Sequence, residues 1–194
     1  QVLTWNGKVV EAYYFSTSAG VTSTDEIWGS DEAAPYLRSV PCKFDEEEPW
    51  SSWIVELPWK MLEDRIREKG KGTVLRSVTV TRRSESGAAT ALEAVSDKDS
   101  CIIENEYEIR KFLAPVNCMI TEKDGTETTG GSLLPSAYFE LERTQNGNLQ
   151  VRGKGYGHGV GMSQTGADKM AEQGYDYREI LDYFFRNITV ENLG

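Results

Sequence analysis

Hydrophobic and polar residues alternate in several short stretches of the chain, and this pattern predicts β-strands. The first two strands, Val2–Trp5 and 9–15, flank Asn6-Gly7, a dipeptide typical of a type I′ hairpin turn. The other predicted strands lie at Trp53–Leu57, 73–83 and 90–96, and in a second hairpin, 136–143 and 148–155, around Asn146-Gly147.

A spacing of three to four residues between hydrophobic positions predicts helices elsewhere. One helix begins at Pro58, because proline fits a first helical position, and ends at Gly70. Its buried face consists of Trp59, Leu62 and Ile66. A short helix is predicted at 107–113.

Two more helices are predicted near the C-terminal end of the chain. Ser163 is the expected N-cap of the first, which ends at Gly174. Asp176 and Glu179 form a capping box at the start of the second. The residues expected to be buried by these helices are Ala167, Met170, Ala171, Ile180, Leu181, Phe184 and Phe185.

The order of these elements predicts the fold class. Strands come early and in the middle, and the helices do not alternate with them regularly, so we expect an α+β fold. We expect mainly antiparallel sheet with a few peripheral helices and a groove. The chain of 194 residues is long enough for one domain, 1–194, in which about 54–130 can form a small subdomain.

Two segments are predicted to be irregular. Segment 16–31 is small and polar, and 35–50 combines prolines with an acidic run, which favours a surface position. Because strand pattern begins at the first residue, we expect the intact protein to contain a segment N-terminal to this chain.

Composition limits the classes of partner. The formal net charge is −10, which makes nucleic acid an unsuitable ligand, and a neutral or weakly charged polymer fits better. The three cysteines form no CxxC pair. The sequence therefore does not decide whether one disulfide forms, and a metal site is not expected. The sequence predicts no cofactor. It also contains no apolar stretch long enough to span a membrane.

A glycine run surrounds the only histidine of the chain, His158. Glycine occupies every second position of 153–161, so in an extended chain one face would carry no side chains. The spacing fits neither GxGxxG nor a Walker motif, which excludes a phosphate cradle. Two interpretations remain open. Either the run is a tightly packed strand with an inert histidine, or its bare face lets a glycan or another segment approach the backbone.

The loop 16–28 carries the side chains that a sugar-binding cleft needs. Ser16 and Ser18 offer hydroxyls, Asp25 and Glu26 offer carboxylates, and Trp28 offers an aromatic face. The alternative is a polar surface loop with Trp28 packed into the core, and composition alone does not separate the two.

The chain resembles the SpoIID/LytB family of bacterial cell-wall proteins. The matching stretches follow the family's order and are "GKVVEAYYFSTSAGVTSTDEIWG" (7–29), "PYLRSV" (35–40), "LLPSAYFEL" (133–141), "GKGYGHGVGMSQTGADKMAEQG" (153–174) and "YREILDYFF" (177–185). Mild departures occur at Ala19, Tyr156 and Thr165. The glycine-histidine motif is the most specific of these matches.

The resemblance implies a role in remodelling peptidoglycan during sporulation. Members act as lytic transglycosylases on glycan strands or as amidase enhancers, so the implied partners are glycan strands and other cell-wall hydrolases. The implied location is outside the cytoplasm, facing the cell wall, with any membrane anchor in a segment absent from this chain. The substrate-binding residues expected here are Ser16, Ser18, Glu26, Trp28, Tyr156, His158 and Gln164.

The resemblance also implies that the family's catalytic glutamate lies N-terminal to this chain. Glu26 is a weak candidate to replace it, since the indole of Trp28 could exclude water and raise the pKa of its carboxyl group. The main alternative is a noncatalytic glycan-binding or amidase-enhancing module. A Cys/His hydrolase is a third, which would need a thiolate near His158.

Overall fold

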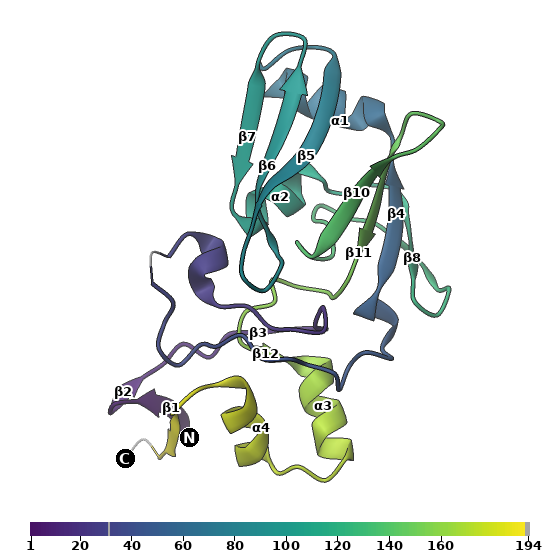
Figure 1. The fold of residues 1–194 in the computed structure, drawn as a ribbon. Helices are drawn as coiled ribbons and strands as arrows, with labels where there is room; N and C mark the ends of the chain where they lie inside the picture. Colours follow the sequence, from purple (N-terminus) through teal and green to yellow (C-terminus); the bar gives the residue numbers. More distant parts are fainter. Residues whose placement is uncertain (31, 193–194) are drawn as a thin grey trace.

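The computed structural model describes residues 1–30 and 32–192 and has the predicted α+β fold (Figure 1). A five-stranded antiparallel sheet crosses one side of the molecule. Its strands, in spatial order, are β10 (Phe139–Arg143), β11 (Leu149–Gly153), β4 (Trp53–Leu57), β8 (Met119–Glu122) and β9 (Glu127–Thr129).

A second antiparallel sheet stands beside the first. It consists of β5 (Leu75–Arg83), β6 (Ala89–Ser96) and β7 (Ser100–Glu104). The helices α1 (Trp59–Glu68) and α2 (Glu106–Phe112) pack against it.

The other elements occupy the end of the molecule that carries both termini (Figure 1). The N- and C-terminal segments pair in a small sheet, and two helices lie beside a short parallel pair. These elements are β1 (Val2–Trp5), β2 (Lys8–Val9), β13 (Thr189–Glu191), β3 (Tyr14–Phe15), β12 (Met162–Ser163), α3 (Gln164–Glu172) and α4 (Tyr177–Phe184), with the 3₁₀ turn η1 (Asp25–Trp28). A second 3₁₀ turn, η2 (Pro49–Ser51), precedes β4 and packs on β8 of the five-stranded sheet.

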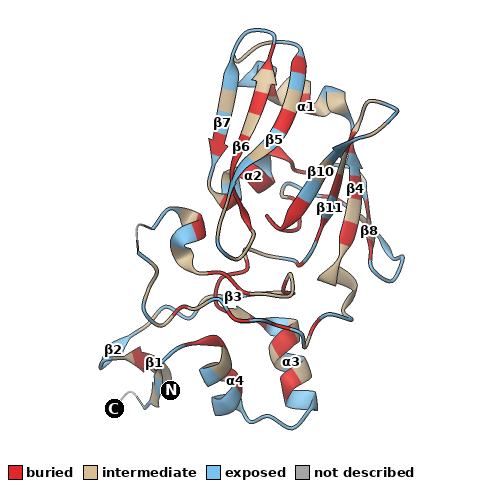
Figure 2. Ribbon diagram, in the orientation of Figure 1, coloured by how far each residue is buried: buried red, intermediate tan, exposed pale blue. Residues whose placement is uncertain are grey.

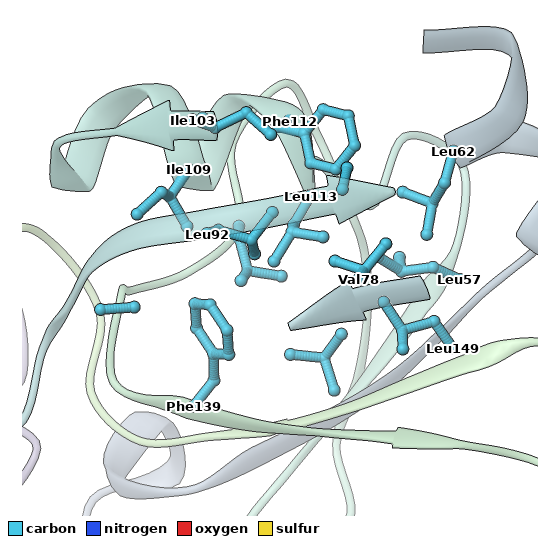
Figure 3. Close-up of a cluster of buried hydrophobic side chains, with 14 of the residues drawn as sticks. Leu57, Leu62, Val78, Leu92, Ile103, Ile109, Phe112, Leu113, Phe139 and Leu149 are labelled. Atoms are coloured by element: carbon cyan, nitrogen blue, oxygen red, sulfur yellow. The ribbon is translucent and has the colours of Figure 1, made fainter. Parts of the chain in front are cut away.

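The buried hydrophobic residues form two clusters, and Figure 2 shows them as red segments in both halves of the molecule. Figure 3 shows the larger cluster, in which Leu57, Leu92 and Leu113 are fully buried. The residues of this cluster lie within 53–151. This range contains the segment 54–130, and the prediction that this segment forms a small subdomain stays a prediction. The second cluster is built around α3, α4 and η1.

Several local predictions are confirmed. Asn6 and Gly7 both have positive φ, 49° and 71°, as a type I′ turn requires. The strand Trp53–Leu57 has the predicted bounds. The side chain of Ser163 accepts a hydrogen bond from the backbone of Gly166, and the predicted capping box at α4 is present.

Other local predictions are wrong. The strand expected over 9–15 is divided into β2 and β3, because β2 pairs with β1 whereas β3 pairs with β12. Ala171 is exposed, since α3 buries a narrower face than its sequence suggests. The strands β7, β8 and β9 were not predicted, because they are short and their pairing partners define them.

The glycine run is not the extended strand that its alternation suggested. Gly155, Gly157, Gly159 and Gly161 all have positive φ, so the chain turns repeatedly there. A Cβ at Gly157 would lie 2.7 Å from the Cβ of Phe15, and one at Gly161 would collide with the carbonyl of Tyr13.

A close approach to the bare backbone is thus confirmed, but its occupant differs from the prediction. The space expected to admit a glycan or an absent helical segment is filled largely by the chain's own segment 13–19 and by Tyr138. Backbone hydrogen bonds fix the contact: Thr17 and Tyr156 exchange two, at 3.1 and 2.8 Å.

No helix in the part of the chain that the structure describes is long and apolar enough to cross a bilayer.

Replacement of Gly157 by Val should cost at least about 3 kcal/mol of unfolding free energy, since the φ of +118° is unfavourable and the Cβ meets Phe15. Gly125 is the matched control, because it has a φ of +88° but nothing within 4 Å of the added Cβ. Gly125→Val should cost only about 1–2 kcal/mol. Urea unfolding of both variants measures the difference, and equal losses would show that packing against Phe15 is unimportant.

Candidate functional site

An open cavity of about 510 Å³ lies between η1 and the β5–β6 hairpin. Glu104, the last residue of β7, and Asn105, which follows it, also line the cavity. Its lining residues are mostly polar and include Glu26, Trp28, Arg82, Arg83, Thr90 and Asn105. A cavity of this size, with an aromatic ring and several hydrogen-bonding groups, suits a small polar ligand or a unit of a polymer.

The sequence of the first loop explains why η1 faces this cavity. Ile27 is buried and anchors the turn in the second hydrophobic cluster, whereas Glu26 is exposed. Gly29 ends the turn with a φ of +97°, and its N–H donates to the carbonyl of Glu26. The carboxylate of Asp25 accepts a hydrogen bond from the backbone of Ala34, at 2.9 Å.

An aromatic cluster lies behind the cavity wall. The ring centroid of Trp28 lies 4.9 Å from that of Tyr13 and 5.2 Å from that of His158. Phe15 contacts His158 from another side, at 5.8 Å. All these contacts are edge-on, so they hold the indole in one orientation while Trp28 remains part of the cavity wall.

His158 is half-buried and uncharged. Its Nδ1 accepts a hydrogen bond of 3.1 Å from the backbone of Val160, which leaves the ring proton on Nε2. Burial lowers the pKa of the imidazole below its usual 6.5. Two nearby charges oppose each other, since Glu106 raises this pKa and Arg110 lowers it.

Glu106 and Arg110 form a buried ion pair on α2. Their side chains are only 2% and 10% exposed, and the guanidinium also donates to the carbonyl of Leu134, at 2.8 Å. Asn105, which caps α2 and lines the cavity, precedes this pair directly. The i, i+4 spacing was visible in the sequence, but nothing in the pattern indicated that the pair is buried.

A second buried carboxylate, Asp45, joins three segments. It accepts hydrogen bonds from the backbone and hydroxyl of Ser18, at 2.8 and 2.7 Å, and from the hydroxyl of Ser163, at 2.6 Å. Asp45 is 1% exposed although it belongs to the acidic run predicted to lie at the surface. That run is therefore only partly superficial, because its first residue supports the start of α3.

The predicted sugar-binding residues do not form one group. Glu26 and Trp28 line the cavity and His158 lies behind Trp28. Ser18 is 1% exposed and bonded to Asp45, so its hydroxyl is not available to a ligand. The position of Ser18 thus gives no support to its predicted binding role.

The remaining predicted residues lie outside the cavity lining. The carbonyl of Ser16 accepts hydrogen bonds from α3, including one from the hydroxyl of Thr165 at 3.0 Å. Tyr156 packs edge-on against Trp50, with centroids 4.6 Å apart. Gln164 is exposed at the first position of α3. Their roles in binding stay predictions.

Glu26 lacks the burial that the acid role requires. Its carboxylate is exposed at the cavity edge, whereas the indole expected to shield it packs on Tyr13 and His158. A carboxylic acid that stays protonated near neutral pH needs an apolar, water-poor surrounding.

Cys42 is unsuited to act as a nucleophile. All three cysteines are free, and burial raises the pKa of the Cys42 thiol to about 12. The Cys42 thiol lies 3.6 Å from Asp45, in the buried network described above. Within residues 1–30 and 32–192, no group of three or more His, Cys, Asp or Glu side chains is arranged to hold a metal ion.

Known proteins resemble this chain over almost its whole length. It is 30% identical to a stage II sporulation protein D of Bacillus amyloliquefaciens and 28% identical to that of Bacillus subtilis strain 168, in each case over 98% of this chain. It is also 24% identical to an amidase enhancer of Bacillus subtilis, again over 98%.

The chain covers 47% and 48% of the two sporulation proteins and 31% of the amidase enhancer, so it spans about half the length of the first two relatives. A family model described as "Domain of unknown function (DUF8618)" matches residues 41–161, more than half of the chain. The chain therefore belongs to the DUF8618 family and, through relatives that match nearly all of it, to the SpoIID family.

Proposed function

We propose that this chain is the glycan-binding part of a lytic transglycosylase-type protein that remodels peptidoglycan during sporulation. The observation that carries the proposal is the open cavity walled by Trp28, whose indole is fixed by His158 and Tyr13. Membership of the SpoIID family and the names of the relatives support the cell-wall role. The site would then face the cell wall, outside the cytoplasm.

The cavity offers a sugar unit two kinds of contact. The indole of Trp28 provides an apolar wall for a sugar ring, and the exposed Arg82 and half-buried Asn105 provide groups that hydrogen-bond to hydroxyls. His158 makes its own hydrogen bonds to the backbone, from Val160 to its Nδ1 and to Tyr14, so it supports the wall by holding Trp28 in place. The residues that line the cavity bind and position the glycan.

The proposed reaction needs one carboxyl group and no water. The acid protonates the oxygen between N-acetylmuramic acid and N-acetylglucosamine as the bond to C1 breaks. The muramic 6-hydroxyl then bonds to C1, and the carboxylate takes the hydroxyl proton, which gives a 1,6-anhydro ring and restores the acid. Among the described residues, Glu26 and Glu104 are the carboxylates that line the cavity, and both are exposed. We propose that the acid lies N-terminal to this chain, as the resemblance to the SpoIID/LytB family implies.

A second candidate function is a noncatalytic module that binds glycan and enhances an amidase. The exposure of both carboxylates is also compatible with this function. The relative named amidase enhancer favours it. The two candidates differ in their products, since only the transglycosylase leaves anhydro-muramic ends.

Replacing Trp28 by Ala should weaken binding of a peptidoglycan tetrasaccharide about tenfold or more, because the apolar wall is lost. Trp59→Ala is the matched control, since Trp59 is also half-buried but packs under Arg143 outside the cavity. Calorimetric titration measures both affinities. Equal weakening by the two substitutions would contradict the assignment of this cavity.

Glu26→Gln should retain cleavage within about twofold, whereas removing a general acid costs about 10²–10⁴-fold. The experiment uses the protein with its N-terminal segment, and mass spectrometry counts anhydro-muramic ends released from glycan strands. A loss of two or more orders of magnitude would make Glu26 the acid. Absence of such ends with the unmodified protein would favour the enhancer module.

The protein should become less stable as pH falls below 6.5, because His158 binds a proton more readily in the unfolded chain. Because burial lowers the pKa of the folded imidazole, the unfolded chain binds the proton first, so this contribution to stability is present above 6.5 and is lost as pH falls toward the lowered value. His158→Gln should reduce the difference in urea midpoint between pH 7.5 and 5.5. An unchanged difference would show that the imidazole titrates as in the unfolded chain.

A further inference from the structure

Three cavities adjoin one another on the protein and share lining residues. Arg83 lines both the cavity at Trp28 and a second cavity of about 280 Å³. Arg152 and Lys154 line the second cavity and also a third, of about 470 Å³, beside Trp53. We call this series of three cavities the long groove.

The fold makes this alignment possible. The turn between β5 and β6 projects toward the lower ends of β10 and β11, as Figure 1 shows, and residues of that turn line the first and second cavities. Glu140 and Arg152 are opposite each other in the β10–β11 register and line the second and third cavities. The long groove therefore crosses from one sheet to the other.

Positive charge is concentrated in the middle of the long groove, although the chain as a whole carries −10. Arg83, Arg152 and Lys154 line this part together with one carboxylate, Glu140. Arg83 is 2.9 Å from Glu140, which leaves the other two cations in excess.

These two cations are open to a ligand. Arg152 is 61% exposed at its side chain and lies 4.0 Å from Glu142, at the limit of an ion pair. Lys154 is exposed and forms no ion pair with the described residues. Grouped cations in a concave surface attract anions more strongly than scattered ones do.

Hydroxyl groups connect the first cavity to the second. Ser84 lines the first and lies 2.8 Å from the hydroxyl of Ser86, which lines the second. The hydroxyl of Tyr138 donates to Ser23 at 2.9 Å beside them, and because both residues are buried this pair supports the wall from behind. The long groove thus offers hydroxyls along its wall and cations at its centre, which matches a polymer that carries both hydroxyl and carboxylate groups.

We propose that the long groove binds consecutive units of one wall glycan and that Arg152 and Lys154 hold carboxylates carried by that glycan. The proposal rests on the proposed glycan-binding function and adds a second, charge-dependent contact region to it. The carboxylates have two sources, the lactyl group of N-acetylmuramic acid or a peptide attached to that group. Both present the same chemistry to a guanidinium and an ammonium.

The test is binding of three peptidoglycan tetrasaccharides that differ only at the lactyl group. One carries free carboxylates, one carries the attached peptides, and in one the carboxylates are converted to neutral amides. The unmodified protein should bind at least one charged form roughly five- to tenfold more tightly than the amide. In the double variant Arg152→Gln, Lys154→Gln that preference should disappear, while affinity for the amide stays the same.

A control variant removes the same charge elsewhere. Arg76→Gln with Lys98→Gln changes two exposed cations outside the long groove and should keep the preference. The charged form that shows the preference identifies the source of the carboxylate.

Binding of the amide without any preference for charge would overturn this inference and leave the proposed function intact. An equal loss of preference in the control variant would also overturn it, because the effect would then come from net charge. If no tetrasaccharide bound at all, the proposed function would itself be wrong.

Discussion

The structure depends on the close contact between the glycine run 153–161 and the segment 13–19. Side-chain atoms at Gly157 or Gly161 would overlap Phe15 or the backbone of Tyr13, and Thr17 and Tyr156 exchange backbone hydrogen bonds across the contact. Only glycine combines the positive φ values with this separation. The contact joins the first loop of the chain to the start of α3, segments about 140 residues apart.

This contact also sets the geometry of the candidate site. Phe15 and Tyr13 are held against the glycine run, and their rings pack on His158 and Trp28. The indole of Trp28 is thereby fixed at the wall of the open cavity. Asp45 reinforces the arrangement by bonding Ser18 to Ser163, so the buried polar groups support the wall while the exposed ones remain available to a ligand.

Local signals in the sequence predicted the parts that neighbouring residues determine. The turn at Asn6-Gly7 and the capping box of Asp176 were readable because each depends on only a few consecutive positions. The burial of Asp45 and the ion pair of Glu106 were not readable, since tertiary contacts bury residues that look superficial. For the same reason, the sequence could associate Trp28 with a sugar site but could not show that Ser18 is buried away from it.

The central claim is that the wall formed by Trp28 receives the glycan. Backbone amide chemical shifts, recorded while an N-acetylglucosamine–N-acetylmuramic acid tetrasaccharide is added, test it most directly. The account predicts saturable shifts concentrated at η1, Asn105 and His158, with the helix α4 unaffected. Shifts confined to α4 or to the small terminal sheet, with none at η1, would contradict it.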